Sequence, residues 1–541
     1  MEENPSPSSS SPPPSKSITK GKASTDSIMG VGLLNDDLLQ NILTRLPALS
    51  FASAACVSKT WNSVSNRILS RPKLSSALSL NPSLTDAVNE VLHKVLAEPI
   101  RPYFAIVNVG SGFESSKILR LVRKRLGFNI PVIVSVTNGI MGRDALTDEF
   151  KEVKWGALFS GIDSEAYARN LNEGIVLTVG YLPGLKVEAI PLRRPPKQTP
   201  QEPRIDNFVM DIKEYSASVS SCKFPVGIIL FGESSSDMKL VLEKLDYAMP
   251  MDTIIVGDER GSFVYCSGND SRSIRGRTRD TEAVALVFAQ DRDRSSGSIR
   301  FHIAFSNGVS TVGARYKAVS VKTNFDDCST WLTARREGQQ ELLDGQSILL
   351  EINDSLENQI ESPELYIGVI KHRKFSIGAE KPMPRTSIAY HGVVGGDEEY
   401  LYVDGIGIKT GDIFQFYHSD PKAALGSLTE VHDALNNIKL EKNSRRFMCD
   451  GDNGVNVFGG LIFACYGRGE SFFGHHNIDS SPFLENFPGV PLGGIFCGGE
   501  MVRPCTTLIG QHQGASPISC CLHVYSTVYL VMTYAPSSVE Q

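Results

Sequence analysis

The chain has 541 residues, of which 41% are hydrophobic and 21% are charged, so it can build hydrophobic cores and two to four domains are expected. Its formal net charge of −6 excludes the basic surface that binds nucleic acid. No apolar run approaches the roughly 20 residues of a membrane span, so no membrane association is expected. The ten cysteines form no C-x-x-C pair, which indicates reduced thiols in the cytoplasm or nucleus.

Residues 1–30 are rich in serine and proline and are expected to form a disordered tail. A small helical module is predicted over 31–78, and its first helix carries four apolar residues at helical spacing: Leu39, Ile42, Leu43 and Leu46. Asn35 is expected to cap this helix and Pro47 to end it, while Ser58 caps a third helix. Three short helices bury little core, so the remaining apolar side chains would face a partner.

This module resembles the F-box, because Leu46-Pro47 follows the leucine-rich first helix and Val57-Ser58-Lys59-Thr60-Trp61 comes next. F-boxes commonly open with Leu-Pro, whereas here Leu34 is followed by Asn35. The resemblance implies docking to a Skp-type adaptor, which joins a cullin in a ubiquitin ligase. Some of the expected adaptor contacts must instead belong to the core of the module. These expected contacts are Leu34, Leu38, Leu39, Ile42, Leu46, Pro47, Val57 and Trp61.

Beyond a helical connector at 79–103, strand and helix signals alternate. A strand at 104–109, an amphipathic helix and a strand at 131–136 form one unit, and the same plan recurs over 226–256. This duplicated strand-helix-strand unit predicts an α+β chain in which a small all-α module precedes a large α/β-type region. Further strands are expected at 283–289, 299–305 and 318–323, and helices at 330–340, 421–425 and 430–440.

The glycine-rich C-terminal part sets charged residues among small ones. An apolar strand, 461–465, leads into a turn that places Arg468 between two glycines, and Glu500 follows another glycine pair. One interpretation is a ligand or substrate pocket formed by Cys465, Arg468 and Glu500. The other is that Arg468 and Glu500 pair with each other or with backbone and lock two hairpins together. Cys465 is either a reactive thiol with a pKa lowered by Arg468 or a buried, inert one.

This region resembles the FIST domain, which occurs in bacterial signalling proteins and in some eukaryotic F-box proteins. The resemblance lies in Gly460–Gly469, Phe487–Phe496 and Gly498-Gly499-Glu500, while Gly308–Lys317 resembles the joint between the two halves of that domain. It implies an N-terminal FIST region at 104–316, a C-terminal FIST region at 317–535 and a tail at 536–541. Bacterial members are thought to bind small molecules such as amino acids.

No nucleophile elbow, phosphate-binding loop or H-E-x-x-H motif occurs, so no catalytic residue, metal or cofactor is expected. No period of 20–29 residues follows a leucine-rich fragment at 74–81, which disfavours a leucine-rich-repeat solenoid. The leading hypothesis is a non-catalytic substrate adaptor of an SCF-type ubiquitin ligase, whose FIST region binds an unknown protein substrate. The alternative is a small-ligand sensor in which the F-box has a secondary function.

Overall fold

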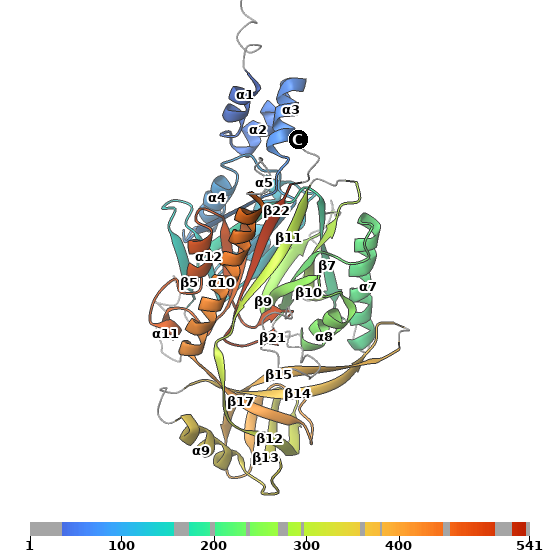
Figure 1. Cartoon of the computed structure of the whole chain (residues 1–541), viewed down its shortest axis with the longest axis vertical. Coiled ribbons are helices and arrows are strands. Elements are labelled where there is room, and N and C mark those ends of the chain that lie inside the picture. Colours follow the sequence, from blue (N-terminus) through green and yellow to red (C-terminus); the bar gives the residue numbers. More distant parts are fainter. Residues whose placement is uncertain are drawn as a thin grey trace, which may run out of the picture.

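The computed structural model describes residues 35–155, 172–194, 201–233, 238–268, 280–293, 297–356, 363–378, 381–446, 455–503 and 522–536. Figure 1 shows three parts along the long axis: a helical module at one end, a body built on two sheets, and a β-barrel at the other end. The predicted combination of a small all-α module and a large mixed region is confirmed at this level. Leu34 and the expected tail at 1–30 lie outside the described residues.

The helical module consists of α1 (Asp36–Leu43), α2 (Ala48–Ala54) and α3 (Lys59–Ile68). Both predicted caps are confirmed. The Asn35 side chain accepts a hydrogen bond from the amide of Asp37, and the Ser58 side chain accepts one from the amide of Trp61. These bonds satisfy amides that have no partner inside their helices.

Two mixed sheets form the body. The larger one, in spatial order, contains β1 (Lys73–Ser79), β6 (Ile175–Tyr181), β2 (Phe104–Val109), β3 (Val132–Val136), β9 (Ile254–Cys266), β8 (Gly227–Glu233), β10 (Thr281–Gln290) and β7 (Leu185–Arg193). In addition, β20 (Glu500–Val502) pairs with β9, and β21 (Leu522–His523) pairs with β20. The smaller one contains β11 (Ser298–Ser306), β22 (Thr527–Ala535), β18 (Asn456–Cys465), β19 (Leu492–Cys497), β4 (Gly139–Arg143) and β5 (Phe150–Lys154). Their inner faces share one core, in which Phe104, Phe288 and Phe301 pack edge to face.

The body helices lie outside the sheets (Figure 1). They are α4 (Leu84–Val95), α5 (Ser115–Leu126), α7 (Gln201–Val219), α8 (Met238–Ala248), α10 (Pro421–Arg446), α11 (Glu470–Phe473) and α12 (Ser481–Asn486). The closed barrel contains β12 (Val309–Asn324), β13 (Ser329–Arg336), β16 (Leu401–Asp404), β15 (Met383–Gly396), β14 (Leu365–Phe375) and β17 (Ile413–Ser419), and α9 (Gly345–Leu356) packs on its core.

The predicted duplication is confirmed, since β2-α5-β3 and β8-α8-β9 are both strand-helix-strand units with parallel strands. The structure shows that each repeat is larger. A first strand and a helix precede it and a last strand follows it, giving the sheet order first-last-second-third: β1-β6-β2-β3 and β7-β10-β8-β9. The described residues contain a third such unit, β11-β22-β18-β19, which the sequence did not reveal because the barrel interrupts it.

The third strands join the three units in a cyclic manner. Strand β3 pairs with the second half of β9, the first half of β9 pairs with β20, and β19 pairs with β4. In each case the third strand of one unit pairs, along its first half, with a later part of the third strand of another unit. That later part is the second half of β9, the strand β20 that follows β19, or the strand β4 that follows β3. The body is therefore a pseudo-threefold arrangement of related units among the described residues, with the barrel inserted into one of them.

Several predicted boundaries and elements are wrong. The boundary between 316 and 317 falls inside β12, and the boundary after 78 falls inside β1, which belongs to the large sheet. Within the connector at 79–103, helix α4 is confirmed, but it packs on that sheet as part of the first repeat. The helix expected at 330–340 is largely strand β13, and the two short helices expected after 420 are one helix, α10.

Candidate functional site

The helical module has a complete core of its own, formed by Leu39, Leu43, Phe51, Ala54 and Val64. Leu39 and Leu43 are four residues apart and share the inner face of α1. The preceding residues, Leu38 and Ile42, repeat the same spacing one position earlier and therefore lie on an adjacent face. Leu38 is 52% exposed, and Leu49 in α2 and Val57 before α3 are each 62% exposed.

The expected adaptor contacts thus divide into groups. Leu38, Ile42, Pro47 and Val57 are exposed, and Leu49 is an exposed apolar residue that the prediction missed. Leu46 and Trp61 are half-buried against the core, and the prediction for Leu39 is wrong because its side chain is only 2% exposed. We call the exposed set Leu38, Ile42, Leu49 and Val57 the apolar face of the module.

The module is tied to the body by hydrogen bonds as well as by the chain. The amide of Ala48 donates to the carbonyl of Leu96 at the end of α4, at 2.9 Å. The Tyr181 hydroxyl, at the end of β6, donates to the carbonyl of Leu69 at 2.6 Å. Because β1 begins at Lys73 and pairs along its length with β6, the module has a defined orientation on the body.

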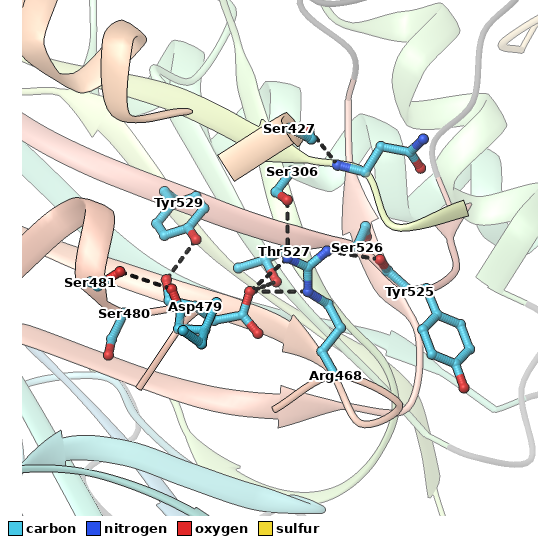
Figure 2. A network of polar contacts seen from close by, with 12 residues as sticks. Ser306, Ser427, Arg468, Asp479, Ser480, Ser481, Tyr525, Ser526, Thr527 and Tyr529 are labelled. Atoms are coloured by element: carbon cyan, nitrogen blue, oxygen red, sulfur yellow. Dashed lines mark hydrogen bonds and ion pairs between the residues drawn. The ribbon is translucent and has the colours of Figure 1, made fainter. Parts of the chain in front are cut away.

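At the other predicted site, Arg468 is fully buried and joins three segments (Figure 2). Its Nε and Nη2 atoms lie 3.0 and 2.8 Å from Asp479 Oδ1. Its Nη1 donates to the carbonyl of Tyr525 and its Nη2 to the Ser306 hydroxyl, each at 3.0 Å. Thr527 donates a further hydrogen bond to the same Asp479 oxygen. This geometry makes Arg468 a buried clamp between the ends of β11, β18 and β22.

Two glycines allow this turn to form. A Cβ atom at Gly467 would lie 2.6 Å from the ring of Tyr525, so the close approach is to a side chain of the same protein. Gly469 has φ +89°, a conformation that other residues rarely adopt. These two glycines therefore accommodate the close packing of the fold itself.

Glu500 is also fully buried, and it does not pair with Arg468. Its carboxylate accepts hydrogen bonds from the amide and the hydroxyl of Ser526, at 3.3 and 2.9 Å. Burial raises the pKa of Glu500 to about 8 despite these donors. Burial likewise raises the pKa of neighbouring Asp258 to about 7, although the amides of Arg260 and Gly498 donate to it. The two carboxyl groups form an acidic cluster where the units meet.

The prediction of a pocket rim at these residues is wrong for Arg468 and Glu500, since neither is accessible. Of the two interpretations of Cys465, the one in which Arg468 lowers the pKa of its thiol does not hold. Burial raises that pKa well above its usual range, and the negative charge of Glu500 adds to the effect. Arg468 holds separate segments together, as the alternative of a lock expected, but its partners are Asp479, the Ser306 hydroxyl and the Tyr525 carbonyl. The inert interpretation of Cys465 fits its raised pKa.

Sequence reasoning missed Asp479 and Asp258. A signal for Asp479 was present, because a buried arginine requires an anion and Asp479 is the one carboxylate between Glu470 and Glu485. No local signal relates Asp258 to Glu500, which come together only through the pairing of β9 with β20. Within the described ranges, no group of three or more His, Cys, Asp or Glu residues is arranged to hold a metal ion. The described helices include none long and apolar enough to cross a membrane.

Comparisons with known proteins agree with the helical module. The F-box domain model matches residues 32–72. A protein of Arabidopsis thaliana named F-box/LRR-repeat protein is 46% identical over 528 residues, which cover 96% of this chain and 97% of that relative. A leucine-rich-repeat solenoid stacks one strand per repeat in parallel, whereas the described strands here form two mixed sheets and a barrel.

Proposed function

The chain belongs to the F-box protein family, and on that premise we propose that it is the substrate-binding adaptor of an SCF-type (Skp–cullin–F-box) ubiquitin ligase. The apolar face of the module carries this proposal. Its four side chains stay exposed on a module whose own core is complete, which is the arrangement expected of a docking surface. A Skp-type adaptor would cover this face and connect the chain to a cullin. The chain itself would be a non-catalytic subunit.

The body would then present the protein substrate, and the fixed orientation of the module would hold that substrate relative to the ligase. We propose that the body is a FIST domain. The supporting residues, 460–469 and 487–496, contain most of β18, β19 and the turn of Arg468, the centre of the third unit. The small-ligand alternative came from the FIST resemblance, and Cys465, Arg468 and Glu500 were its candidate pocket. Two of these are buried, and the third has a thiol with a raised pKa, so nothing there favours it.

Binding of the purified full-length chain to a Skp-type adaptor tests this proposal. Leu38→Asp and Val57→Asp each place a charge on the apolar face, and we expect each to weaken binding at least about tenfold, which corresponds to about 1.4 kcal/mol. Leu146→Asp is the matched control, because Leu146 is 76% exposed but lies in the β4–β5 turn. Equal binding by wild type and both variants, with unchanged melting temperatures, would rule out docking through this face.

A further inference from the structure

The three units end in equivalent edge strands, β1, β7 and β11, but these edges differ in chemistry. Charged residues and proline on an edge strand discourage pairing with another chain. Strand β7 carries Lys186, Glu188, Pro191 and Arg193, and β11 carries Arg300 and His302. Strand β1 reads KLSSALS and has neither charge nor proline after Lys73. Of these three edges, β1 has the least protection against an added strand, since its one charged residue is the first residue of the strand.

The register shows which backbone groups of β1 point away from the sheet. Leu74 is opposite Gly180 of β6, whose carbonyl accepts a hydrogen bond from Tyr103 on its far side. At the other end of β1, the carbonyl of Leu78 accepts a hydrogen bond from Ala145, at 2.8 Å, on the outer edge. Because backbone groups alternate along a strand, those of Leu74 and Ser76 also point outward. Among the described strands, none pairs with this edge between 73 and 77.

A groove of about 680 Å³ runs along this edge. Its apolar wall contains Phe150, Phe458, Leu484 and Val490, and this wall lies on the side of the smaller sheet. Lys94 and Glu98, from the end of α4 and just beyond it, line the opposite, polar side. The groove is within the size range of ligand pockets, and the β4–β5 turn beside Leu78 closes one end of it.

We propose that this groove binds an extended segment of a partner protein as an additional strand antiparallel or parallel to β1. The outward groups of Leu74 and Ser76 would supply backbone hydrogen bonds. Side chains of a strand alternate between its two sides, so the segment would place apolar residues toward Phe458, Leu484 and Val490 and polar residues toward Lys94 and Glu98. The partner is thus recognised by an alternating apolar and polar pattern in an extended conformation.

This inference rests on the proposed function only in identifying the partner as a substrate. The groove starts at Pro72, directly after the module, so a bound segment would lie beside the part of the chain that docks on the ligase. The test below contains no Skp-type adaptor. If no peptide binds, the groove proposal is refuted and the adaptor proposal stands. If the adaptor does not bind the apolar face, the adaptor proposal is refuted and the groove proposal stands.

The probe is an arrayed library of nine-residue peptides that alternate Val or Leu with Ser or Thr, used at up to about 1 mM. We expect binders, whose affinity for the full chain is then measured by fluorescence anisotropy. Ser76→Pro removes the outward amide and should weaken binding at least about tenfold. Ser76→Ala, which removes the hydroxyl bonded to Thr178 but keeps the amide, should change affinity less than about twofold. Melting temperatures identify any loss of folding.

A second measurement uses wild-type protein alone, so it does not depend on how the variants fold. Binders are N-methylated at alternate residues, in two sets, because only every second amide of an added strand faces β1. One set should lose binding and the other should keep it. The proposal is overturned by the absence of binders, by equal tolerance of both sets, or by unchanged binding to Ser76→Pro. It is also overturned if binding needs removal of residues 1–34, or if Ser76→Pro separates a dimer, since the occupant would then be this chain itself.

Discussion

At the scale of single residues, Arg468 and Glu500, the two charged members of the predicted pocket, have structural roles. Arg468 offers its donors to Asp479, Tyr525 and Ser306 inside the body, where an unpaired charge would be very costly. The pattern correctly predicted a charged residue held in a glycine turn. It could not predict burial, because the segments that cover Arg468 lie 57 and 162 residues away along the chain.

Replacing Arg468 by Met should destabilise the fold by about 3–5 kcal/mol, because Asp479 would be left as a buried charge without its partner. The double change of Arg468→Met with Asp479→Leu should recover much of this loss, since it removes both charges. Urea unfolding of the full chain measures the effect. A loss below about 1 kcal/mol for the single variant would show that the clamp does not hold the body together.

Glu500 and Asp258 should make stability depend on pH. Their pKa values in the folded protein, about 8 and about 7, exceed the values near 4 of unfolded chains. The folded state therefore binds more protons at these two groups across this interval, so their contribution to stability is fully present at pH below about 4 and is lost as pH rises toward 8.

We expect wild-type stability to decrease between about pH 5.5 and about pH 9, and Glu500→Gln to reduce that decrease and to be the more stable form at the higher pH. The glutamine keeps an acceptor for Ser526 and cannot ionise. Urea midpoints at both pH values provide the measurement. Parallel curves for the two proteins would mean that Glu500 does not titrate in this interval.

At the scale of elements, local signals predicted the helical module and the centres of the first two repeats. The caps at Asn35 and Ser58 and the strand-glycine-helix pattern after 104 act over a few residues, so they are visible in the sequence. The edge strands β1 and β7, the third repeat and the barrel depend on pairing between distant segments. Residues 330–340 show the limit of prediction from local signals. Their sequence has helical signals, but pairing with β12 and β16 in the barrel makes 329–336 a strand.

The two faces of α1 should respond differently to mutation. Leu39→Ala removes a buried side chain and should destabilise the module by about 2–5 kcal/mol. Leu38→Ala, at the neighbouring exposed position, should change stability by less than about 0.5 kcal/mol. Hydrogen exchange of amides in α1–α3 distinguishes loss of the module from global unfolding. Similar effects of the two changes would contradict the division between core and apolar face.

At the scale of the whole molecule, the pseudo-threefold body separates the helical module from the barrel (Figure 1). The module is fixed to the first unit by hydrogen bonds from Ala48 and Tyr181. The barrel is inserted in the third unit, and its two ends meet where the amide of Asp420 donates to the carbonyl of Gly308. A partner bound on the body would thus have a defined position relative to the apolar face, which is what an adaptor needs.

We propose that the chain connects body-bound proteins to a ubiquitin ligase through the apolar face. Its most direct test is the lifetime of proteins captured by the full chain while cullin activity is inhibited. After inhibition ends, these proteins should be degraded faster in cells with wild-type chain than in cells with the Leu38→Asp, Val57→Asp double variant, which should still capture them. Equal lifetimes with both chains, with the variant folded and defective in adaptor binding, would show that the apolar face does not direct captured proteins to degradation.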